Sequence, residues 1–546
     1  MTEKSRYRKK ASSSKPRDGK IVNLIENNYK IIVILLLVAF SAQVIYAILT
    51  YSPTYDEMKH VNAAYKYLRT GNYDIDVEHP PLIALNGLPA LAGNFSLPDN
   101  MMHDVYGDEF EQLLVYSRLI TLFYGLLLGI FVFLWAKDLF GISGGLLALF
   151  LYSFEPNMIA FSSLVATDLL GTCFIFIAMY FFFRFITRTS FLNATLSGIF
   201  LGVSIVAKFT AVYMFLLVLI VGLICSWKKT ERLKYLGLLA LIFVFALFVI
   251  NGAYLFKGTF DPYSRADVHN FKFLNSLRAH PAVKDIPVPL PEKFIVGINY
   301  VKWHTSKHFA PAFLMGKYAE HGFWYYFFVA ILIKTPIPLL LLFLLCVMLL
   351  FTSILSGKQK RGALFLLIPV LLLLVLVSFF NNLNIGLRHI LPIYPFLIVL
   401  ASASILFFKN NQNRQVVLCI LLIWYVVSAV FVAPDYLSYF NELIGGSKYG
   451  YRYLIDSNID WGQGAKAVKE YMEKSEVPIS REVGCTYTPG KFIFPANDLV
   501  GLGGPNDCLK WLREQTPERA IGGFILFNVP NKTVQNKTAD DAGQKV

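Results

Sequence analysis

Cysteine is scarce in this chain, and its distribution limits what the few copies can do. Only 6 of the 546 residues are Cys. Four of them lie in apolar segments, where they are expected to be small core or lipid-facing side chains: Cys173, Cys225, Cys346 and Cys419. Cys485 and Cys508 lie in a polar C-terminal region. They could form a disulfide if that region faces an oxidising compartment.

Acidic residues are also few. The chain has 36 Asp and Glu against 50 Lys and Arg, a formal net charge of +14. The basic residues outside the N-terminus lie in short loops between apolar runs, where they orient membrane spans, so this charge does not indicate nucleic-acid binding. Residues 1–30 hold a further basic cluster and are expected to form a disordered cytoplasmic arm.

Two further patterns are missing. The first apolar run is too long for a signal-peptide core and lacks a small-residue cleavage site, so it should stay as an anchor. No internal repeat of about 20–50 residues is evident.

Apolar residues, in contrast, are abundant. Hydrophobic residues make up 55% of the chain and the mean hydropathy is +0.52. Apolar runs of about 18 residues or more recur, as in a polytopic membrane protein with an all-α membrane domain. We expect about eleven spans, at 31–50, 114–136, 141–154, 158–183, 191–207, 211–227, 233–256, 323–354, 362–380, 387–408 and 414–433.

The basic loops predict the orientation of these spans. Arg184, Lys228 and Lys358 mark loops on the side of the basic N-terminus, and the positive-inside rule makes that side cytoplasmic. The long loops 51–113 and 257–322 then face the other side, and so does the C-terminus.

This orientation predicts the domain organisation. Residues 31–433 would form the transmembrane domain and residues 434–530 a small α/β extracytoplasmic domain. Residues 531–546 would form a disordered tail.

An acidic pair, Asp56-Glu57, follows the first span directly. Thr54 and Glu57 match a capping box, and Gly71 can close the helix that it starts. The apolar residues of this helix recur at helical spacing, which suggests an amphipathic helix on the membrane surface. Acidic residues in a first helical turn also serve the helix dipole, and the same geometry would keep Asp56 ionised as a general base.

Other ionisable residues flank the predicted spans. In Glu78-His79-Pro80-Pro81 the prolines restrict the backbone, and the Glu-His pair could bind a metal or a phosphate, or be a solvated loop pair. Asp168 lies in an apolar run, where an ionisable group usually faces a polar cavity; a structural pair with Lys208 is the alternative.

Three cations are expected near the extracytoplasmic face, against the positive-inside trend: Lys208, Arg388 and His389. Snorkelling explains each one singly. Together with the acidic loop they favour a phosphate site, since Arg grips phosphate oxygens bidentately and Lys supplies a point charge.

The C-terminal region contains the polar motif Asp456-Ser-Asn-Ile-Asp460-Trp461-Gly462-Gln463. Its Asp, Asn and Gly residues are typical of a turn before a helix. Trp461 could also stack on a sugar while Asp460 accepts hydroxyl hydrogen bonds.

These motifs together resemble a known family. The acidic pair, the Pro-Pro element, Ala-Thr-Asp168, Lys208-Phe-Thr and Arg388-His389-Ile-Leu-Pro-Ile-Tyr-Pro are similar to motifs of polyprenyl-phosphate-dependent glycosyltransferases with the GT-C membrane fold. Protein O-mannosyltransferases and the bacterial aminoarabinose transferase are the relatives in view, and the C-terminal motif resembles a subgroup of bacterial members. The resemblance covers about residues 30–465.

The resemblance implies an inverting glycosyltransferase that takes a sugar from a polyprenyl monophosphate at the extracytoplasmic face of the plasma (inner) membrane. Asp56 would be the catalytic base, with Glu57 and Asp168 as further catalytic candidates. Glu78, His79, Lys208, Arg388, His389, Asp460 and Trp461 would bind substrate. His79 stands where the aminoarabinose transferase has a Lys. No metal is obligatory on this interpretation, because cations can neutralise the leaving phosphate; a divalent ion at Glu78 stays open.

The acceptor would be a hydroxyl of a glycan, lipid or protein, and the sequence names neither acceptor nor sugar. Two alternatives remain: a transporter or flippase of lipid-linked sugars that uses Asp168 and Lys208 as a midplane ion pair, and a non-catalytic binder of such lipids.

Overall fold

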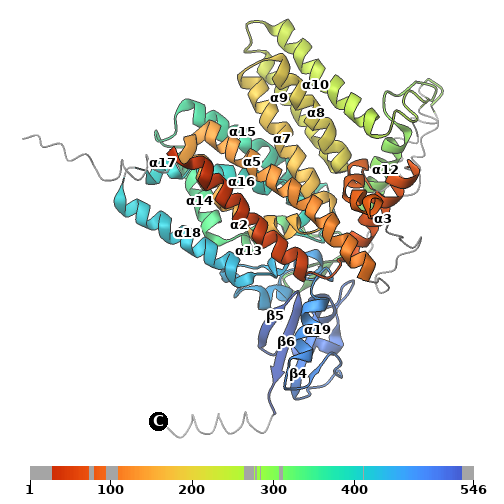
Figure 1. Ribbon diagram of the computed structural model, residues 1–546, viewed down its shortest axis with the longest axis vertical. Helices are drawn as coiled ribbons and strands as arrows, with labels where there is room; N and C mark the ends of the chain where they lie inside the picture. Colours follow the sequence, from red (N-terminus) through yellow and green to blue (C-terminus); the bar gives the residue numbers. More distant parts are fainter. Residues whose placement is uncertain are drawn as a thin grey trace, which may run out of the picture.

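The computed structural model describes residues 27–72, 79–93, 108–262, 276, 280–282, 284–306, 311–380, 382–409 and 411–531. Long helices form a slanted bundle, and a small sheet-containing unit lies at one end of it (Figure 1). The longer helices are α2 (Tyr29–Thr50), α3 (Tyr55–Thr70), α5 (Asp108–Ser153), α7 (Thr167–Thr187), α8 (Phe191–Ala207), α9 (Val212–Ser226), α10 (Arg232–Ala253), α12 (Glu292–Ser306), α14 (Ile337–Leu349), α15 (Gly357–Phe379) and α18 (Gln412–Val432).

Shorter elements connect them. These are η1 (Pro81–Gly87), α4 (Leu88–Ala92), α6 (Pro156–Ser162), η2 (Phe209–Ala211), α13 (Tyr326–Lys334), η4 (Leu387–Ile390), α16 (Ile393–Ser402), α17 (Ile405–Phe408), η5 (Tyr436–Ser438), η6 (Glu442–Ile444), η7 (Ser447–Arg452), η8 (Asp456–Asn458), α19 (Ala465–Glu473), α20 (Ala496–Val500), η9 (Asp507–Leu509) and α21 (Lys510–Arg513).

The chain is a multi-pass membrane protein. Among the described residues, 7 helices are long and apolar enough to cross a membrane, or up to 8 if a bent pair is one span. The α8 segment and the α16–α17 segment are apolar but shorter. The predicted number of about eleven spans therefore stays a prediction.

Several expected spans are interrupted in the structure. The expected spans 114–136 and 141–154 lie in α5, which breaks at Gly141 with φ 80°. The expected span 323–354 is divided into α13 and α14, which meet at an angle of 114°. Pro336 lies at this bend, and proline cannot donate the backbone hydrogen bond that would continue a helix.

The expected span 158–183 also differs from the structure. Helix α6 ends at Ser162, and α7 begins only at Thr167, so Asp168 lies in the first turn of α7, at one end of a candidate span rather than in its middle. This position gives the carboxylate the favourable end of a helix dipole.

Helix α7 is at the centre of the bundle. It packs against α5, α8 and α16, whereas α2 exposes most of its apolar surface. Helices α8 and α10 approach closely because Gly202 has no side chain: a Cβ there would lie 2.7 Å from the carbonyl oxygen of Ala246. Small residues allow such close packing between membrane helices.

Helix α3 confirms the predicted capping box. The backbone N–H of Thr54 donates to Glu57 Oε2 at 2.9 Å, and Gly71 ends the helix in the left-handed conformation with φ 61°. The apolar face of α3 packs against η1, α4 and the start of α5, through residues such as Met58 and Val61. Protein therefore covers this face, and the predicted position of the helix on the membrane surface stays a prediction.

The C-terminal region contains a 4-stranded sheet in the order β3-β4-β6-β5. The strands are β3 (Ile479–Ser480), β4 (Gly490–Pro495), β5 (Pro517–Ile521) and β6 (Phe524–Val529), and only the β3–β4 pair is parallel. Helix α19 packs on this sheet through Val468, Ile493 and Leu526. This arrangement confirms the predicted small α/β region, and Cys485 and Cys508 are disulfide-bonded within it.

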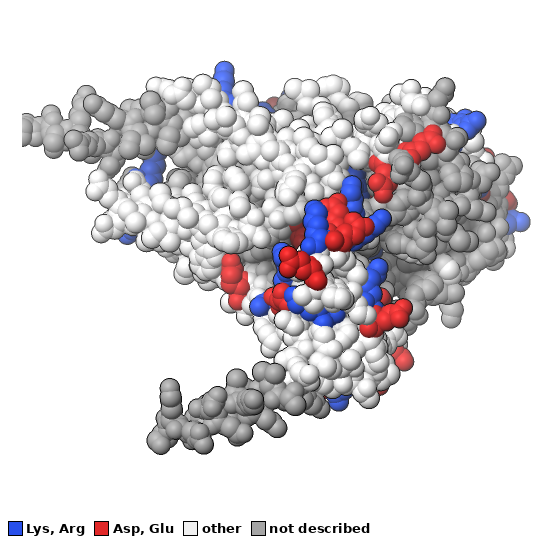
Figure 2. Space-filling model, turned by 60° about the horizontal axis from the view of Figure 1, so that its bottom comes forward, with Lys and Arg blue, Asp and Glu red and all other residues white. Residues whose placement is uncertain are grey.

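The two parts of the molecule differ in charge on the face that Figure 2 shows. In Figure 2 charged side chains gather on the C-terminal unit, whereas the helical body is mostly uncharged in this view.

A hairpin of β1 (Ala312–Leu314) and β2 (Lys317–Ala319) lies beside the C-terminal unit. The Tyr318 hydroxyl of this hairpin donates to the carbonyl of Val500 at 2.9 Å.

Candidate active site

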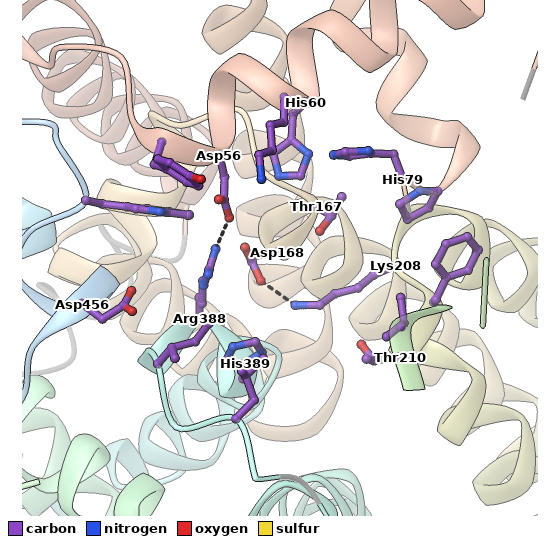
Figure 3. A pocket seen from close by; sticks show the side chains of 18 of the residues that line it. Asp56, His60, His79, Thr167, Asp168, Lys208, Thr210, Arg388, His389 and Asp456 are labelled. Atoms are coloured by element: carbon purple, nitrogen blue, oxygen red, sulfur yellow. Dashed lines mark hydrogen bonds and ion pairs between the residues drawn. The ribbon is translucent and has the colours of Figure 1, made fainter. Parts of the chain in front are cut away.

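A cavity of about 700 Å³ lies where the helical bundle meets the C-terminal unit. The start of α3, the start of α7, the turn after α8, η4 and the segment around η8 all contribute to its wall (Figure 3). Eight of the ten predicted site residues line it: Asp56, His79, Asp168, Lys208, Arg388, His389, Asp460 and Trp461.

Asp56 and Arg388 form an ion pair across the cavity. Arg388 Nη1 lies 2.5 Å from Asp56 Oδ2, although the residues are 332 positions apart in the sequence. Burial alone would raise the pKa of Asp56, but the charges of Arg388 and Lys59 hold this pKa below its ordinary value. Asp56 is therefore ionised at neutral pH and faces the cavity, as a general base must.

Asp168 and Lys208 form a second ion pair. Lys208 Nζ lies 2.5 Å from Asp168 Oδ1. Gly171, on the next turn of α7, permits this pair, because a Cβ there would lie 2.7 Å from the Cβ of Lys208. The partner that the sequence suggests for Asp168 is thus the observed one, and both side chains line the cavity.

Glu57 lies away from the cavity. Its Oε2 lies 2.6 Å from Arg118 Nη2, and its Oε1 accepts from the backbone N–H of Val165 at 2.9 Å. Arg118 also donates to the carbonyl oxygens of Tyr51 and Ser52. Glu57 and Arg118 are almost fully buried. The structure therefore gives Glu57 a connecting position between helices rather than access to substrate.

Three histidines line the cavity: His60, His79 and His389. The His60 and His79 rings meet edge to face, with their centroids 4.8 Å apart. Burial, with His79 nearby, lowers the pKa of His60 to about 3, so His60 is neutral at physiological pH. Glu78, which precedes His79, lies outside the described residues.

Some polar atoms of the cavity wall have no hydrogen-bond partner among the described residues. They are His60 Nδ1, His389 Nε2 and Arg388 Nε, and all three are buried. Buried polar groups are normally satisfied, so these atoms are available to a bound molecule.

The motif around Asp460 forms one wall. Trp461 is buried, and the guanidinium carbon of Arg388 lies 4.4 Å from the centre of its indole ring. Burial raises the pKa of Asp456, and it raises the pKa of Asp460 to about 6. The turn chemistry is also present, since Asp460 Oδ1 accepts from the backbone N–H of Gly462 at 3.2 Å.

Sequence reasoning assigned no role to several lining residues, among them His60, Asp456 and Asn497. His60 lies four positions after Asp56 on one helix, and this spacing could have indicated a shared face. Asp456 belongs to the polar motif but had no assigned role. Asn497 enters from α20 and bonds to the backbone at Asp456 and Asp460, and no local signal marks it.

A metal centre is not evident in the part of the chain that the structure describes. No group of three or more His, Cys, Asp or Glu there could hold a metal ion. The metal predicted at Glu78 stays a prediction, because this residue is not described.

Comparisons with known proteins give one family match. Residues 101–251 match the model of the dolichyl-phosphate-mannose-protein mannosyltransferase family. No curated protein sequence matches the chain.

Similar solved structures include ArnT, a protein O-mannosyltransferase complex and an oligosaccharyltransferase. ArnT from Cupriavidus metallidurans bound to undecaprenyl phosphate has a TM-score of 0.45 and 13% identity, over 77% of this chain and 70% of that chain. The S. cerevisiae protein O-mannosyltransferase Pmt1-Pmt2 complex bound to the sugar donor has a TM-score of 0.36 and 19% identity, over 42% of this chain and 33% of that chain. The Archaeoglobus fulgidus oligosaccharyltransferase in its apo form has a TM-score of 0.46 and 12% identity, over 73% of this chain and 54% of that chain.

The family match lies within the region that carries the motifs. It therefore confirms the glycosyltransferase class and the predicted resemblance of this chain to the polyprenyl-phosphate-dependent GT-C glycosyltransferases.

Proposed function

We propose that this protein transfers a sugar, with inversion, from a polyprenyl monophosphate to an acceptor hydroxyl at the extracytoplasmic face of the plasma (inner) membrane. The observation that carries the proposal is the meeting of two carboxylate–cation pairs, Asp56–Arg388 and Asp168–Lys208, in one cavity. Two cations can bind a phosphate, and an ionised carboxylate can take a proton.

The reaction follows from these groups. Asp56 takes the proton of the acceptor hydroxyl while that oxygen attacks the anomeric carbon. The bond from this carbon to the phosphate oxygen breaks, and its electron pair stays on the leaving polyprenyl monophosphate. Arg388 and Lys208 stabilise the negative charge that the phosphate gains, which is where electrostatic catalysis contributes most.

The contact between Arg388 and Asp56 supports this division of roles. The guanidinium has five N–H donors and uses Nη1 on Asp56, while Nε has no partner among the described residues. Arg388 can therefore bind a phosphate oxygen and still contact the base. This arrangement keeps Asp56 ionised and close to the reacting centre.

The sugar would lie between the two ion pairs. His60 and His389 present unpartnered nitrogens to this space, and the neutral state of His60 suits a sugar hydroxyl. Asp460 and Trp461 form the wall on the side of the C-terminal unit, where we place the acceptor.

Transfer by this route requires no metal ion, because Arg388 and Lys208 neutralise the leaving group. We expect full activity after treatment with EDTA. Loss of activity that Mg²⁺ or Mn²⁺ restores would instead support a divalent ion, with Glu78 as the first candidate ligand.

The experiment that tests the function is a comparison of glycolipids and glycoproteins by mass spectrometry. A deletion strain would be complemented with the wild type or with Asp56→Asn. We expect one sugar modification to disappear on deletion, to return with the wild type and to stay absent with the variant. A variant that restores the modification would contradict catalysis by Asp56 and favour a lipid transporter or binder.

A further inference from the structure

The polar segment 456–463, named the clamp segment below, contacts both halves of the Asp56–Arg388 pair. It is buried although it is rich in polar residues: Ser457, Asn458, Asp460 and Gln463 are each at most 7% exposed. Buried polar side chains need defined partners, so their contacts show what the segment holds in place.

One set of contacts holds the turn that carries Arg388. Asn458 Oδ1 accepts from the backbone N–H of Leu387 at 2.9 Å, and the Ser457 hydroxyl donates to the carbonyl of Ile385 at 2.8 Å. The Trp461 ring then lies against the Arg388 guanidinium, at 4.4 Å. Backbone and side chain of Arg388 are thus both placed by the clamp segment.

A second set holds the start of α3, which carries Asp56. The backbone N–H of Tyr55 donates to the carbonyl of Trp461 at 3.1 Å. The N–H of Ser52 donates to the carbonyl of Gln463 at 2.9 Å. These bonds lie within four residues of Asp56, so they define where its helix begins.

The clamp segment is itself firmly held. Lys334 Nζ donates to the carbonyl of Asn458 at 2.5 Å. Asn497 accepts from the N–H of Asp456 at 2.7 Å and donates to the carbonyl of Asp460 at 2.9 Å. Asp456 has φ 60°, a conformation that costs energy for a residue with a side chain and persists only where the surroundings impose it.

We propose that the clamp segment positions Asp56 and Arg388 relative to each other, with Trp461 and Asn458 as positioning residues and Asn497 as the contact from the C-terminal unit. The effect on catalysis rests on the proposed function. The structural part of the inference, that one segment holds both Asp56 and Arg388 in place, is independent of that function.

Loss of these contacts should lower the rate, because an active site tolerates only small displacements of its catalytic groups. Catalytic groups must keep their geometry to within a fraction of an ångström, and small displacements reduce the rate strongly. The face of Trp461 already contacts Arg388, so its primary role here is to hold the cation rather than to stack on a sugar.

The structural part is tested by hydrogen–deuterium exchange of the purified full chain. In Asn497→Ala, amides in residues 52–58 and 382–391 should both exchange faster, by about 2- to 10-fold, as expected from the loss of individual hydrogen bonds. Asn506→Ala is the matched control, because Asn506 lies in the same unit and bonds to the carbonyl of Asp498. Unchanged exchange in either peptide of Asn497→Ala would overturn the clamp.

The catalytic part is tested with undecaprenyl phosphate as the probe. Trp461→Leu should weaken its binding by roughly 2- to 30-fold, the range for a lost cation–π contact, and Trp461→Phe should keep most of it. Phe407→Leu is the control, because Arg414 lies 4.1 Å from the centre of that ring, away from the cavity. Equal binding by wild type and Trp461→Leu would contradict a positioning role.

A merely structural defect would behave differently. It would lower the fraction of active protein, whereas a displaced Arg388 also raises the pKa of Asp56 and moves the acidic limb of the rate profile to higher pH. If Trp461→Leu does not fold, Asn497→Ala provides the same readouts. Wild-type protein that does not bind undecaprenyl phosphate would refute the proposed function, and the exchange experiment would still decide the clamp.

Discussion

The two ion pairs of the cavity differ in how open they are. In the Asp56–Arg388 pair the carboxylate side chain is 25% exposed, whereas in the Asp168–Lys208 pair it is 7% exposed. The cation is 12% exposed in both pairs. Asp56 lies on the amphipathic helix α3, and Asp168 lies at the start of α7, the most buried of the candidate membrane helices among the described residues.

This difference separates two roles for the same chemistry. A carboxylate that is open to the cavity can meet an acceptor hydroxyl, whereas an enclosed one mainly fixes its cation. We therefore infer that Asp56 is the base and that Asp168 positions Lys208 for the phosphate. The sequence analysis had named Asp168 as a catalytic candidate as well. The predictions below test this difference.

The largest effect is expected at Asp56. Asp56→Asn should lower kcat by roughly 10²–10⁴-fold, the contribution of a general base, while the variant folds, because Asn is also accepted in a first helical turn. Asp168→Asn should mainly raise the donor KM. Both are measured as steady-state rates of the purified enzymes. If Asp168→Asn lowers kcat as much as Asp56→Asn and leaves the KM unchanged, both carboxylates are catalytic and the division of roles is wrong.

A third ion pair, Glu57–Arg118, lies away from the cavity. It tests whether a carboxylate in an ion pair contributes to catalysis only when it lines the cavity. Glu57→Gln leaves Arg118 buried without a charged partner, and the free energy of unfolding should fall by about 3–5 kcal/mol. Glu111→Gln, exposed on α5, is the control. Thermal unfolding in detergent measures the loss. A variant with wild-type stability and no turnover would instead make Glu57 catalytic.

Arg388 should contribute to donor binding more than an anchoring cation would. Arg388→Ala should weaken the binding of undecaprenyl phosphate by about 1.5–3 kcal/mol, the value for a lost charged hydrogen bond. Arg388→Lys should restore only part of it, because the planar fork is absent. Full restoration by Lys, or unchanged affinity in Arg388→Ala, would make Arg388 a snorkelling side chain.

Asp460 provides a carboxylate without an ion-pair partner among the described residues. Because burial raises its pKa from 3.8 to about 6, the stability that it contributes is complete below about pH 3.8 and is lost as the pH rises through about 6. Asp460→Asn should therefore stabilise the protein at pH 7.5, on the order of 2 kcal/mol, and have no effect at pH 4. Denaturation at both pH values decides this, and equal effects at both would refute it.

The smallest perturbation tests the side of the membrane on which both pairs lie. A cysteine placed at the C-terminus should react with an impermeant thiol reagent in intact cells. The Cys485–Cys508 disulfide supports this orientation, since such bonds persist in oxidising compartments. Labelling only after lysis would place both ion pairs on the cytoplasmic face and contradict the proposed reaction.

The structure confirms the local predictions most completely. The capping box at Thr54, the end of α3 at Gly71 and a helix soon after the polar motif 456–463 all appear as the sequence indicates. Asp168 with Lys208 was correctly given as one alternative. The position of α3 on the membrane surface stays a prediction, because amphipathic spacing shows that a helix has an apolar face, and here protein covers that face.

The sequence by itself determined what depends on near neighbours: hydropathy over about 18 residues, helix caps within one turn, and the family motifs. Only the tertiary structure decided that Arg388 contacts Asp56, that Arg118 removes Glu57 from the cavity, and that 456–463 touches both halves of the site. The physical reason is range. Periodicity and capping act within a few residues, whereas these contacts depend on how distant helices pack.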